Sequence, residues 1–232
     1  MKTYYKEAII MAVGLFLLGL CVSYGLTTAF GNKRVVSVKG LAEREVEANK
    51  VIWPLSYTEL GNDLGGLYKE CSMKNQLIVS FLKNNGIAEK DITVKAPQVT
   101  DMSANQYGDN NSGYRYKVES CVTVASTNVA TVRKLILQQS ELLNTGIAIK
   151  GNDYDNQLVY EFTDLNKIKP EMIEEATKNA RKAGEKFAQD SESNLGKIKQ
   201  AAQGQFSIED RDVNTPHIKK VRVVTTIDFY LE

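Results

Sequence analysis

The stretch from Val38 to Tyr57, VKGLAEREVEANKVIWPLSY, decides how the fold begins. Side chains alternate between the two faces of an extended strand, so every second residue shares a face. The first half of the stretch therefore places three carboxylates in one row: Glu43, Glu45 and Glu47. Such a row is compatible with a catalytic or metal site, with a face in contact with water, or with a surface that recognises a partner.

The same stretch predicts two strands that meet near Asn49, within residues 35–60. The second strand contains Trp53, Leu55 and Tyr57 at alternate positions, which is typical of a half-buried strand. Pro54 has no N–H to donate to a neighbouring strand. We therefore expect the second strand to be bulged or to lie at a sheet edge around this residue.

The rest of the chain predicts helices and strands in alternation, with a polar loop over residues 101–113. Helical spacing of apolar residues, ended in each case by a glycine, is found at residues 63–85, 127–144 and 170–194. Strand patterns are found at residues 92–99, 114–124, 147–150, 158–162, 197–208 and 218–231. The third helix has an inner stripe of mostly small residues: Ala176, Ala180, Ala183, Gly184 and Phe187. The fold class is therefore predicted to be α+β, with long helices packed on one face of a largely antiparallel sheet and one N-terminal hydrophobic helix before it.

That N-terminal helix is expected from a run of 23 residues without a charge, residues 8–30. At about 1.5 Å per residue the run is roughly 35 Å long, enough for a hydrocarbon core of about 30 Å. It is either a retained single-pass anchor, which places residues 8–30 in the membrane, or a cleaved signal peptide. We expect residues 1–32 to form this anchor or signal sequence and residues 33–232 to form one α+β domain.

Composition and motifs indicate few chemical functions. The 29 basic and 28 acidic residues are evenly mixed, which argues against nucleic-acid binding because that requires clustered basic charge. The single histidine, His217, has no catalytic partner near it in sequence. The segment GNDYDN at residues 151–156 lacks the central glycine of a calcium loop and is expected to be a polar turn. We therefore expect no catalytic residue, no cofactor site and no metal site, and a protein that is not an enzyme.

The glutamate row is expected to be a polar surface. Its neighbouring carboxylates start about 6.6 Å apart and the outer pair about 13 Å apart, whereas metal ligands converge to about 2.0–2.6 Å from one ion. Like charges in a row are stabilised by water or by basic residues on a neighbouring strand or subunit. The predicted interface therefore combines the three glutamates with three basic residues of the last strand: Lys219, Lys220 and Arg222.

Two cysteines follow the N-terminal run, and their patterns place them in different layers. Cys71 falls on the apolar face of the first predicted helix, whereas Cys121 falls on the polar face of a strand with Lys117 and Glu119. We therefore expect them not to form a disulfide with each other, because their Cβ atoms would point apart. Their redox state in the cell remains open.

Four segments together resemble the SIMPL-domain family of bacterial envelope proteins: VVSVKGLAEREVEANKVIWPLSY, NNGIAEKDITV, ATKNARKAGEKFAQDSESNLGKI and KVRVVTTIDFYL. The resemblance covers nearly everything after residue 32. It implies an α+β domain in the periplasm, attached to the inner membrane unless the leader is cleaved, and assembly into ring-like or channel-like homo-oligomers. It also implies a link to envelope integrity or oxidative-stress tolerance, and it transfers no catalytic residue. The alternative function is a periplasmic binding module for a small ligand or peptide, whose identity the sequence leaves open.

Overall fold

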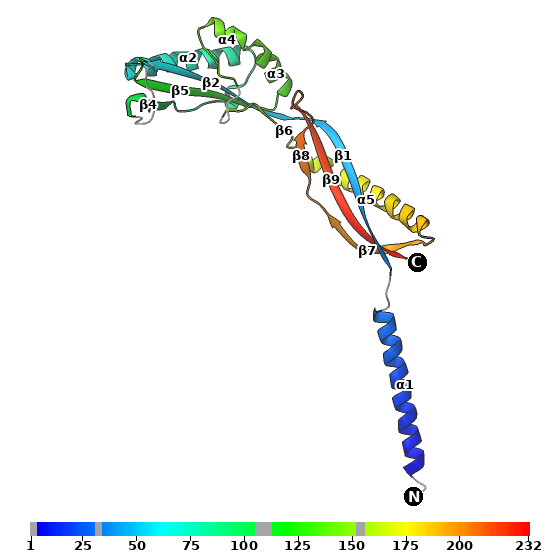
Figure 1. The fold of residues 1–232 in the computed structure, drawn as a ribbon. Helices are drawn as coiled ribbons and strands as arrows, with labels where there is room; N and C mark the ends of the chain where they lie inside the picture. Colours follow the sequence, from blue (N-terminus) through cyan, green and yellow to red (C-terminus); the bar gives the residue numbers. More distant parts are fainter. Residues whose placement is uncertain (1–3, 31–33, 105–112, 152–155) are drawn as a thin grey trace. The chain divides into compact units, whose positions relative to one another are not determined.

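The computed structural model describes residues 4–30, 34–104, 113–151 and 156–232. The chain divides into two compact units. Unit 1 contains Met1–Ala42, Ile173–Gly204 and Val224–Glu232, and unit 2 contains Glu43–Met172 and Gln205–Val223. The α+β class is confirmed, and the strands form two antiparallel sheets (Figure 1).

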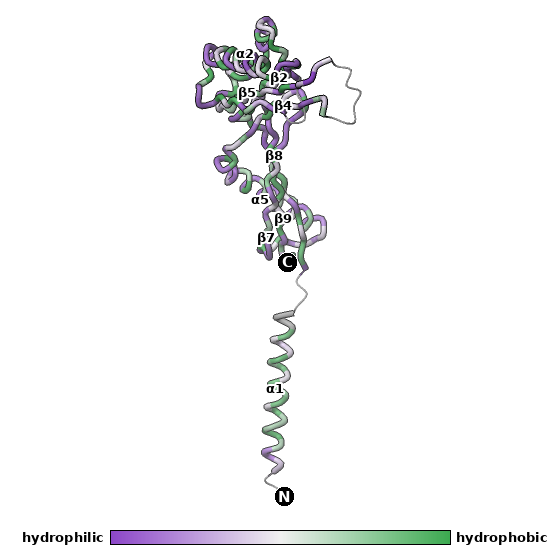
Figure 2. The backbone as a smooth tube through the Cα atoms, turned by 90° about the vertical axis from the view of Figure 1, so that its left-hand side faces the viewer, coloured by the Kyte–Doolittle hydropathy of each residue, from purple (hydrophilic) through white to green (hydrophobic). Residues whose placement is uncertain are grey.

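The N-terminal apolar helix, α1 (Tyr4–Phe30), is confirmed. Residues Tyr4–Leu26 reach a mean hydropathy of 2.3, and the segment is long and apolar enough to cross a membrane. Figure 2 shows that the helix is hydrophobic along most of its length. A signal sequence has the same length and composition, so α1 is a signal anchor or a signal peptide by these criteria.

The first sheet has the strand order β1-β9-β7, formed by β1 (Val35–Glu47), β9 (Ile218–Leu231) and β7 (Leu195–Gln203), with β8 (Ser207–Asp210) also paired to β9. β9 alternates between buried and more exposed residues along its whole length. Four of its residues share the buried face, as predicted: Val221, Val223, Ile227 and Phe229. β7 and β8 both pair antiparallel to β9, over different parts of it.

In unit 1, helix α5 (Leu165–Asp190) lies against this sheet at very short range. A Cβ atom added to Gly40 of β1 would stand 1.8 Å from the carbonyl oxygen of Ala176 and 2.5 Å from the amide nitrogen of Ala180. Both alanines are fully buried. The small inner stripe predicted for this helix therefore exists because strand and helix backbones almost touch.

Two details of the third predicted helix were wrong. Phe187 is 59% exposed, and the buried stripe continues through Ala188, which is 2% exposed. The close approach leaves room only for small side chains, so the larger ring lies outside the seam. The bounds were also wrong: the helix runs from Leu165 to Asp190 rather than over 170–194, so Pro170 is its sixth residue and lies beyond the first turn. At that position the proline cannot donate the hydrogen bond to the carbonyl of residue 166.

The second sheet belongs to unit 2 and has the order β3-β5-β2-β6, with β4 also paired to β5. Its strands are β2 (Lys50–Gly61), β3 (Ile92–Val94), β4 (Gln98–Asp101), β5 (Tyr116–Ser126) and β6 (Val159–Glu161). Two helices, α2 (Leu64–Asn84) and α3 (Val129–Gln138), pack on one face of β2 and β5 (Figure 1). A short helix, α4 (Ser140–Asn144), completes the second predicted helical region.

The core of unit 2 fills the space under these helices. Its fully buried members include Val51, Leu55, Tyr57, Ile78, Leu82, Val122, Val132 and Ile147. Ile147 was expected in a strand, but residues 147–150 form none, although the side chain is buried as the pattern required. A residue can thus be recognised as core without its backbone geometry being known.

Pro54 lies where β2 has an open side, as predicted. β6 pairs with β2 only over Lys50–Ile52. Two residues after the proline, the Ser56 carbonyl accepts a bond from the Lys150 N–H at 2.7 Å instead of bonding to β5. Since alternate residues of a strand turn their backbone groups to the same side, the nitrogen of Pro54 also points away from β5.

Candidate functional site

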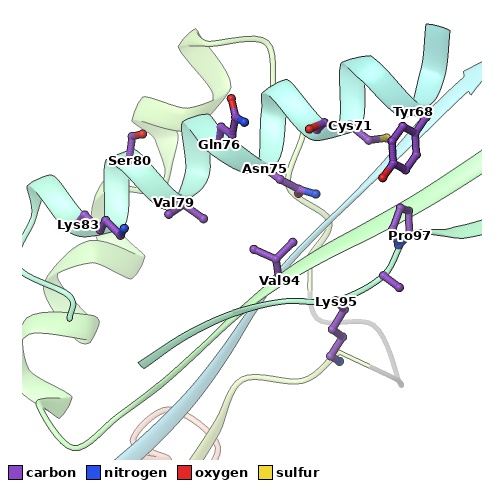
Figure 3. Close-up of a pocket in the computed structure, with 12 residues that line it drawn as sticks. Tyr68, Cys71, Asn75, Gln76, Val79, Ser80, Lys83, Val94, Lys95 and Pro97 are labelled. Carbon is purple, nitrogen blue, oxygen red and sulfur yellow. The ribbon is translucent and has the colours of Figure 1, made fainter. Parts of the chain in front are cut away.

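A cleft of about 770 Å³ lies in unit 2 between α2 and the edge formed by β3 and β4 (Figure 3). Figure 3 shows Tyr68 and Pro97 at one end, Lys83 toward the other, and Val94 directed toward Val79 of the helix. The size falls in the range of about 300–1,000 Å³ that is typical of ligand sites. One wall is the amphipathic helix α2. The start of this helix is capped by Asp63, whose side chain accepts hydrogen bonds from the N–H groups of residues 65 and 66.

The opposite wall is open because of a β-bulge. Val94 pairs with Val122, whereas Gln98 pairs with Glu119. Three residues of the edge, 95–97, therefore oppose only two on β5, 120 and 121. A bulge bends the strand and interrupts its pairing. The continuous strand predicted for residues 92–99 is thus divided into β3 and β4, and the division lies at the mouth of the cleft.

Behind two residues that line the cleft, Cys71 and Asn75, lies a buried polar cluster. The Tyr57 hydroxyl donates toward the Cys71 carbonyl at 2.9 Å and lies 3.0 Å from Asn75 Oδ1, which also accepts from the Ser120 hydroxyl at 3.0 Å. Burial raises the pKa of the Tyr57 hydroxyl and of the Cys71 thiol. Both groups are therefore neutral at pH 7, and neither is a charged nucleophile.

A second, apolar pocket of about 420 Å³ adjoins the cleft and shares Tyr68 and Pro97 with it. Its other walls include Leu64 of α2 and Val99 of β4, which are 40% and 50% exposed. The two spaces together offer an apolar end and a polar middle along one helix. In the described part of the chain, the ionisable side chains that line them are Lys83 and Lys95, besides Tyr68 and Cys71.

The residues of the predicted interface are only partly brought together. Glu43 of β1 meets Lys220 and Arg222 of β9 at 3.0 Å and 3.5 Å, which is the cross-strand pairing expected. Glu45 instead pairs with Arg211 at 3.3 Å, and Lys219 pairs with Asp210 of β8. Glu47 has no ion-pair partner among the described residues.

His217 lies beside Tyr160, with ring centroids 6.1 Å apart, and its carbonyl accepts a 2.8 Å hydrogen bond from the Ala48 N–H. Burial and the nearby charge of Arg133 lower its pKa. The imidazole is therefore largely neutral at pH 7. This environment is that of a half-buried ring directly before the start of β9.

Cys71 and Cys121 occupy opposite faces of the second sheet, as their patterns predicted, and both are free thiols. Cys121 lies 3.6 Å from the Thr123 hydroxyl on the face away from α2. Within the described ranges, no group of three or more histidine, cysteine or acidic residues has a geometry that could hold a metal ion. Two predicted features, the polar turn at 151–156 and the loop at 101–113, fall largely outside the described residues.

The cleft itself was missed at the level of sequence. Its helical wall was predicted correctly, but the edge at residues 92–99 was taken as one strand. Pro97 was the available signal, because a proline inside a strand pattern indicates a bulge or an edge. Nothing in the sequence indicated that α2 and the edge at residues 92–99 would enclose a cleft.

Comparison with known proteins identifies the family of the chain. No curated protein matches the chain. Residues 36–224 match the SIMPL family, described as a protein of unknown function (DUF541), and the match extends over both compact units. The match includes β1 from its second residue on, the small-residue helix α5 and the first half of β9, up to residue 224. The chain is therefore a member of the SIMPL family, preceded by an N-terminal apolar helix.

Proposed function

We propose that the protein is a non-enzymatic component of the bacterial cell envelope that is anchored by α1, exposes residues 33–232 to the periplasm and self-associates. In this role it contributes to envelope integrity or oxidative-stress tolerance. The anchor is supported by the length and hydropathy of α1. The envelope location is supported by membership of the SIMPL family, because resemblance to this family implies a periplasmic domain.

The observation that carries self-association is that, among the described residues, the outer strands of the first sheet pair only with β9. Its order places β1, 13 residues long, at one edge, and β7 and β8 at the other. Open edges carry unpaired backbone N–H and C=O groups that can pair with another chain. Since the two edges differ, pairing β1 of one copy with the other edge of the next is a head-to-tail contact, which closes into a ring when the rotation permits.

Native mass spectrometry of the full chain in detergent tests this proposal. We expect a discrete oligomer that persists as the detergent is exchanged. A strictly monomeric protein at about 100 μM, in two detergents and in lipid nanodiscs, would refute self-association. The intact mass from the same experiment also shows whether α1 is retained, because cleavage removes about 30 residues.

A second function, a periplasmic binding module, is favoured by the cleft beside α2. The cleft joins an apolar pocket to a row of fixed polar groups, which is the usual composition of a ligand site. A thermal-shift screen of small metabolites against the full chain tests this function. Saturable stabilisation that Tyr68→Ala abolishes supports it, whereas shifts that the variant leaves unchanged place the binding elsewhere.

A further inference from the structure

The cleft beside α2 has an unpaired strand edge as one wall. Lys95 of the edge donates its N–H to the Cys121 carbonyl, and Met102 donates to the Arg115 carbonyl. Because neighbouring residues of a strand turn their backbone groups to opposite sides, those of Val94 and Val99 point away from β5. Among the described residues these outward groups have no partner, since β3 and β4 pair only with β5.

The side chains of the same two valines face α2 rather than water on the other side of the sheet. Val94 lines the cleft and Val99 lines the apolar pocket. They are 48% and 50% exposed, beside a Tyr68 ring that is 64% exposed. A strand added next to this edge would satisfy the outward backbone groups and cover these three side chains at once.

The dimensions of the cleft suit an extended peptide. From Tyr68 to Lys83 the helical wall covers 15 residues, which is about 22 Å at 1.5 Å per residue. An extended peptide of about seven residues covers the same distance at roughly 3.3 Å per residue. An alkyl chain suits this cleft less well, because its middle is lined by polar side chains of α2: Ser72, Asn75, Gln76 and Ser80.

Charge defines one end of the ligand. Among the described residues, no aspartate or glutamate lines the cleft or the apolar pocket, whereas two lysines do. Lys95 points away from the helix in Figure 3, so Lys83 is the cation that faces the far end of the cleft. Its pair with Glu89, at 2.7 Å, is solvent-exposed, and such pairs exchange for another carboxylate at little cost.

We infer that this cleft binds an extended peptide as an additional β-strand on the β3–β4 edge, with a large apolar side chain in the Tyr68 pocket and a carboxylate at Lys83. The occupant is an acidic, β-prone segment of another protein. The apolar pocket lies at the Val99 end and Lys83 toward the Val94 end, so a peptide with its apolar residue first and its carboxylate last runs antiparallel to β3 and β4. The inference rests on the binding-module function and names its ligand class.

The test uses the full chain in lipid nanodiscs and a fluorescein-labelled peptide, acetyl-LTVTVTE, followed by fluorescence anisotropy. Two derivatives of the peptide separate backbone pairing from simple apolar contact. One carries N-methyl groups on both valine amides, which face the protein edge in an antiparallel arrangement, and the other carries them on two threonine amides, which face water. We expect the first to bind at least about tenfold more weakly than the parent and the second to bind nearly as well, because only the first loses two backbone hydrogen bonds.

Protein variants locate the site. We expect Tyr68→Ala to weaken binding about tenfold and Lys83→Gln about threefold at low salt, with the second effect lost at high salt. Leu137→Ala and Lys69→Gln are matched controls, because both residues are exposed on helices and neither lines the cleft. Both controls should bind the peptide as the unchanged protein does.

Three results would overturn the inference: no saturable binding of the parent peptide up to 1 mM, equal binding of the two N-methylated peptides, or loss of binding in the controls but not in Tyr68→Ala. The small-molecule screen separates this failure from that of the binding-module function. If metabolites stabilise the protein through Tyr68 while the peptide does not bind, the cleft is a ligand site of another class. If neither binds, both proposals fall.

Discussion

Replacing Gly40 with alanine tests the closest contact in unit 1. Gly40 lies in β1, where the backbone of α5 crosses the strand without space for a side chain. The two nearest atoms to an added Cβ belong to the backbone: the Ala176 carbonyl oxygen at 1.8 Å and the Ala180 nitrogen at 2.5 Å. Backbone atoms of a helix cannot rotate away as a side chain can, so the strand and the helix must separate.

The size of the effect follows from these distances. A carbon–oxygen contact normally requires about 3.3 Å, so the helix must move by roughly 1.5 Å. Overpacking of a close-packed core costs about 1–3 kcal/mol, and we expect the upper end, about 3 kcal/mol, because the movement also opens gaps around two fully buried alanines. For a domain of this size each kcal/mol lowers Tm by about 2–4 °C, so Tm should fall by roughly 6–12 °C.

Thermal unfolding of the full chain in detergent, followed by circular dichroism, measures this change. Gly65→Ala is the matched control, since its Cβ would meet only the Asp63 side chain at 3.5 Å. It should leave Tm unchanged or raise it slightly, because alanine favours the helix by up to about 1 kcal/mol relative to glycine. Hydrogen exchange should increase in α5 and β1 of the Gly40→Ala protein and stay unchanged in α2.

A second substitution separates a backbone clash from ordinary crowding. Adding Ala180→Gly to Gly40→Ala removes the side-chain contact at 2.8 Å but neither of the two shorter contacts. We therefore expect no recovery of Tm. Recovery to the value of the unchanged protein, or a Gly40→Ala protein with unaltered Tm, would show that the separation of β1 and α5 has been misjudged.

Three further predictions concern unit 2. Hydrogen bonds from two lysines hold the pKa of Glu119 at about 2, so the free energy of unfolding should fall as pH drops from about 4.5 toward 2. In acid titrations Glu119→Gln should reduce this fall by less than about 1 kcal/mol, because the carboxylate is partly exposed. Tyr57→Phe should lower the free energy of unfolding by about 1–2 kcal/mol in urea, whereas Tyr68→Phe should change it by less than about 0.5 kcal/mol, since only the first hydroxyl is buried and bonded. Glu47→Lys should disturb oligomers in native mass spectrometry without lowering Tm, whereas Glu43→Lys should lower Tm as well, because among the described residues Glu43 alone of the two has ion-pair partners in its own chain. An intact oligomer with Glu47→Lys would remove that residue from the proposed interface.

The elements themselves were largely predictable, because they depend on local periodicity. The two-strand start around Asn49, the helix between Asp63 and Gly86, and the buried alternation of β9 all followed from spacing and terminal residues. Gly86 has a φ of +87°, a conformation that glycine adopts without steric cost, which is why it ends α2. These signals involve residues that are neighbours in sequence.

The pairing of residues across the chain was less predictable. The glutamate row was correctly placed on a polar face, but the pattern of a single strand does not say which lysine or arginine forms an ion pair with which glutamate. Glu43 meets the last strand, whereas Glu45 meets Arg211, more than 160 residues away in sequence. The candidate site shows the same limit, since α2 was expected but its partner edge was not seen as interrupted.

The sequence by itself determined the membrane-length apolar helix, the α+β class, the small-residue stripe of α5 and the polarity of each strand face. These depend on composition and on the fixed periods of helix and strand. Only the tertiary structure decided that Gly40 touches the backbone of α5, that Glu47 is left without an ion-pair partner in the described chain, and that a bulge at Pro97 opens a cleft beside α2. The physical reason is that register and close approach are set by how distant surfaces pack, and a local pattern carries no information about that distance.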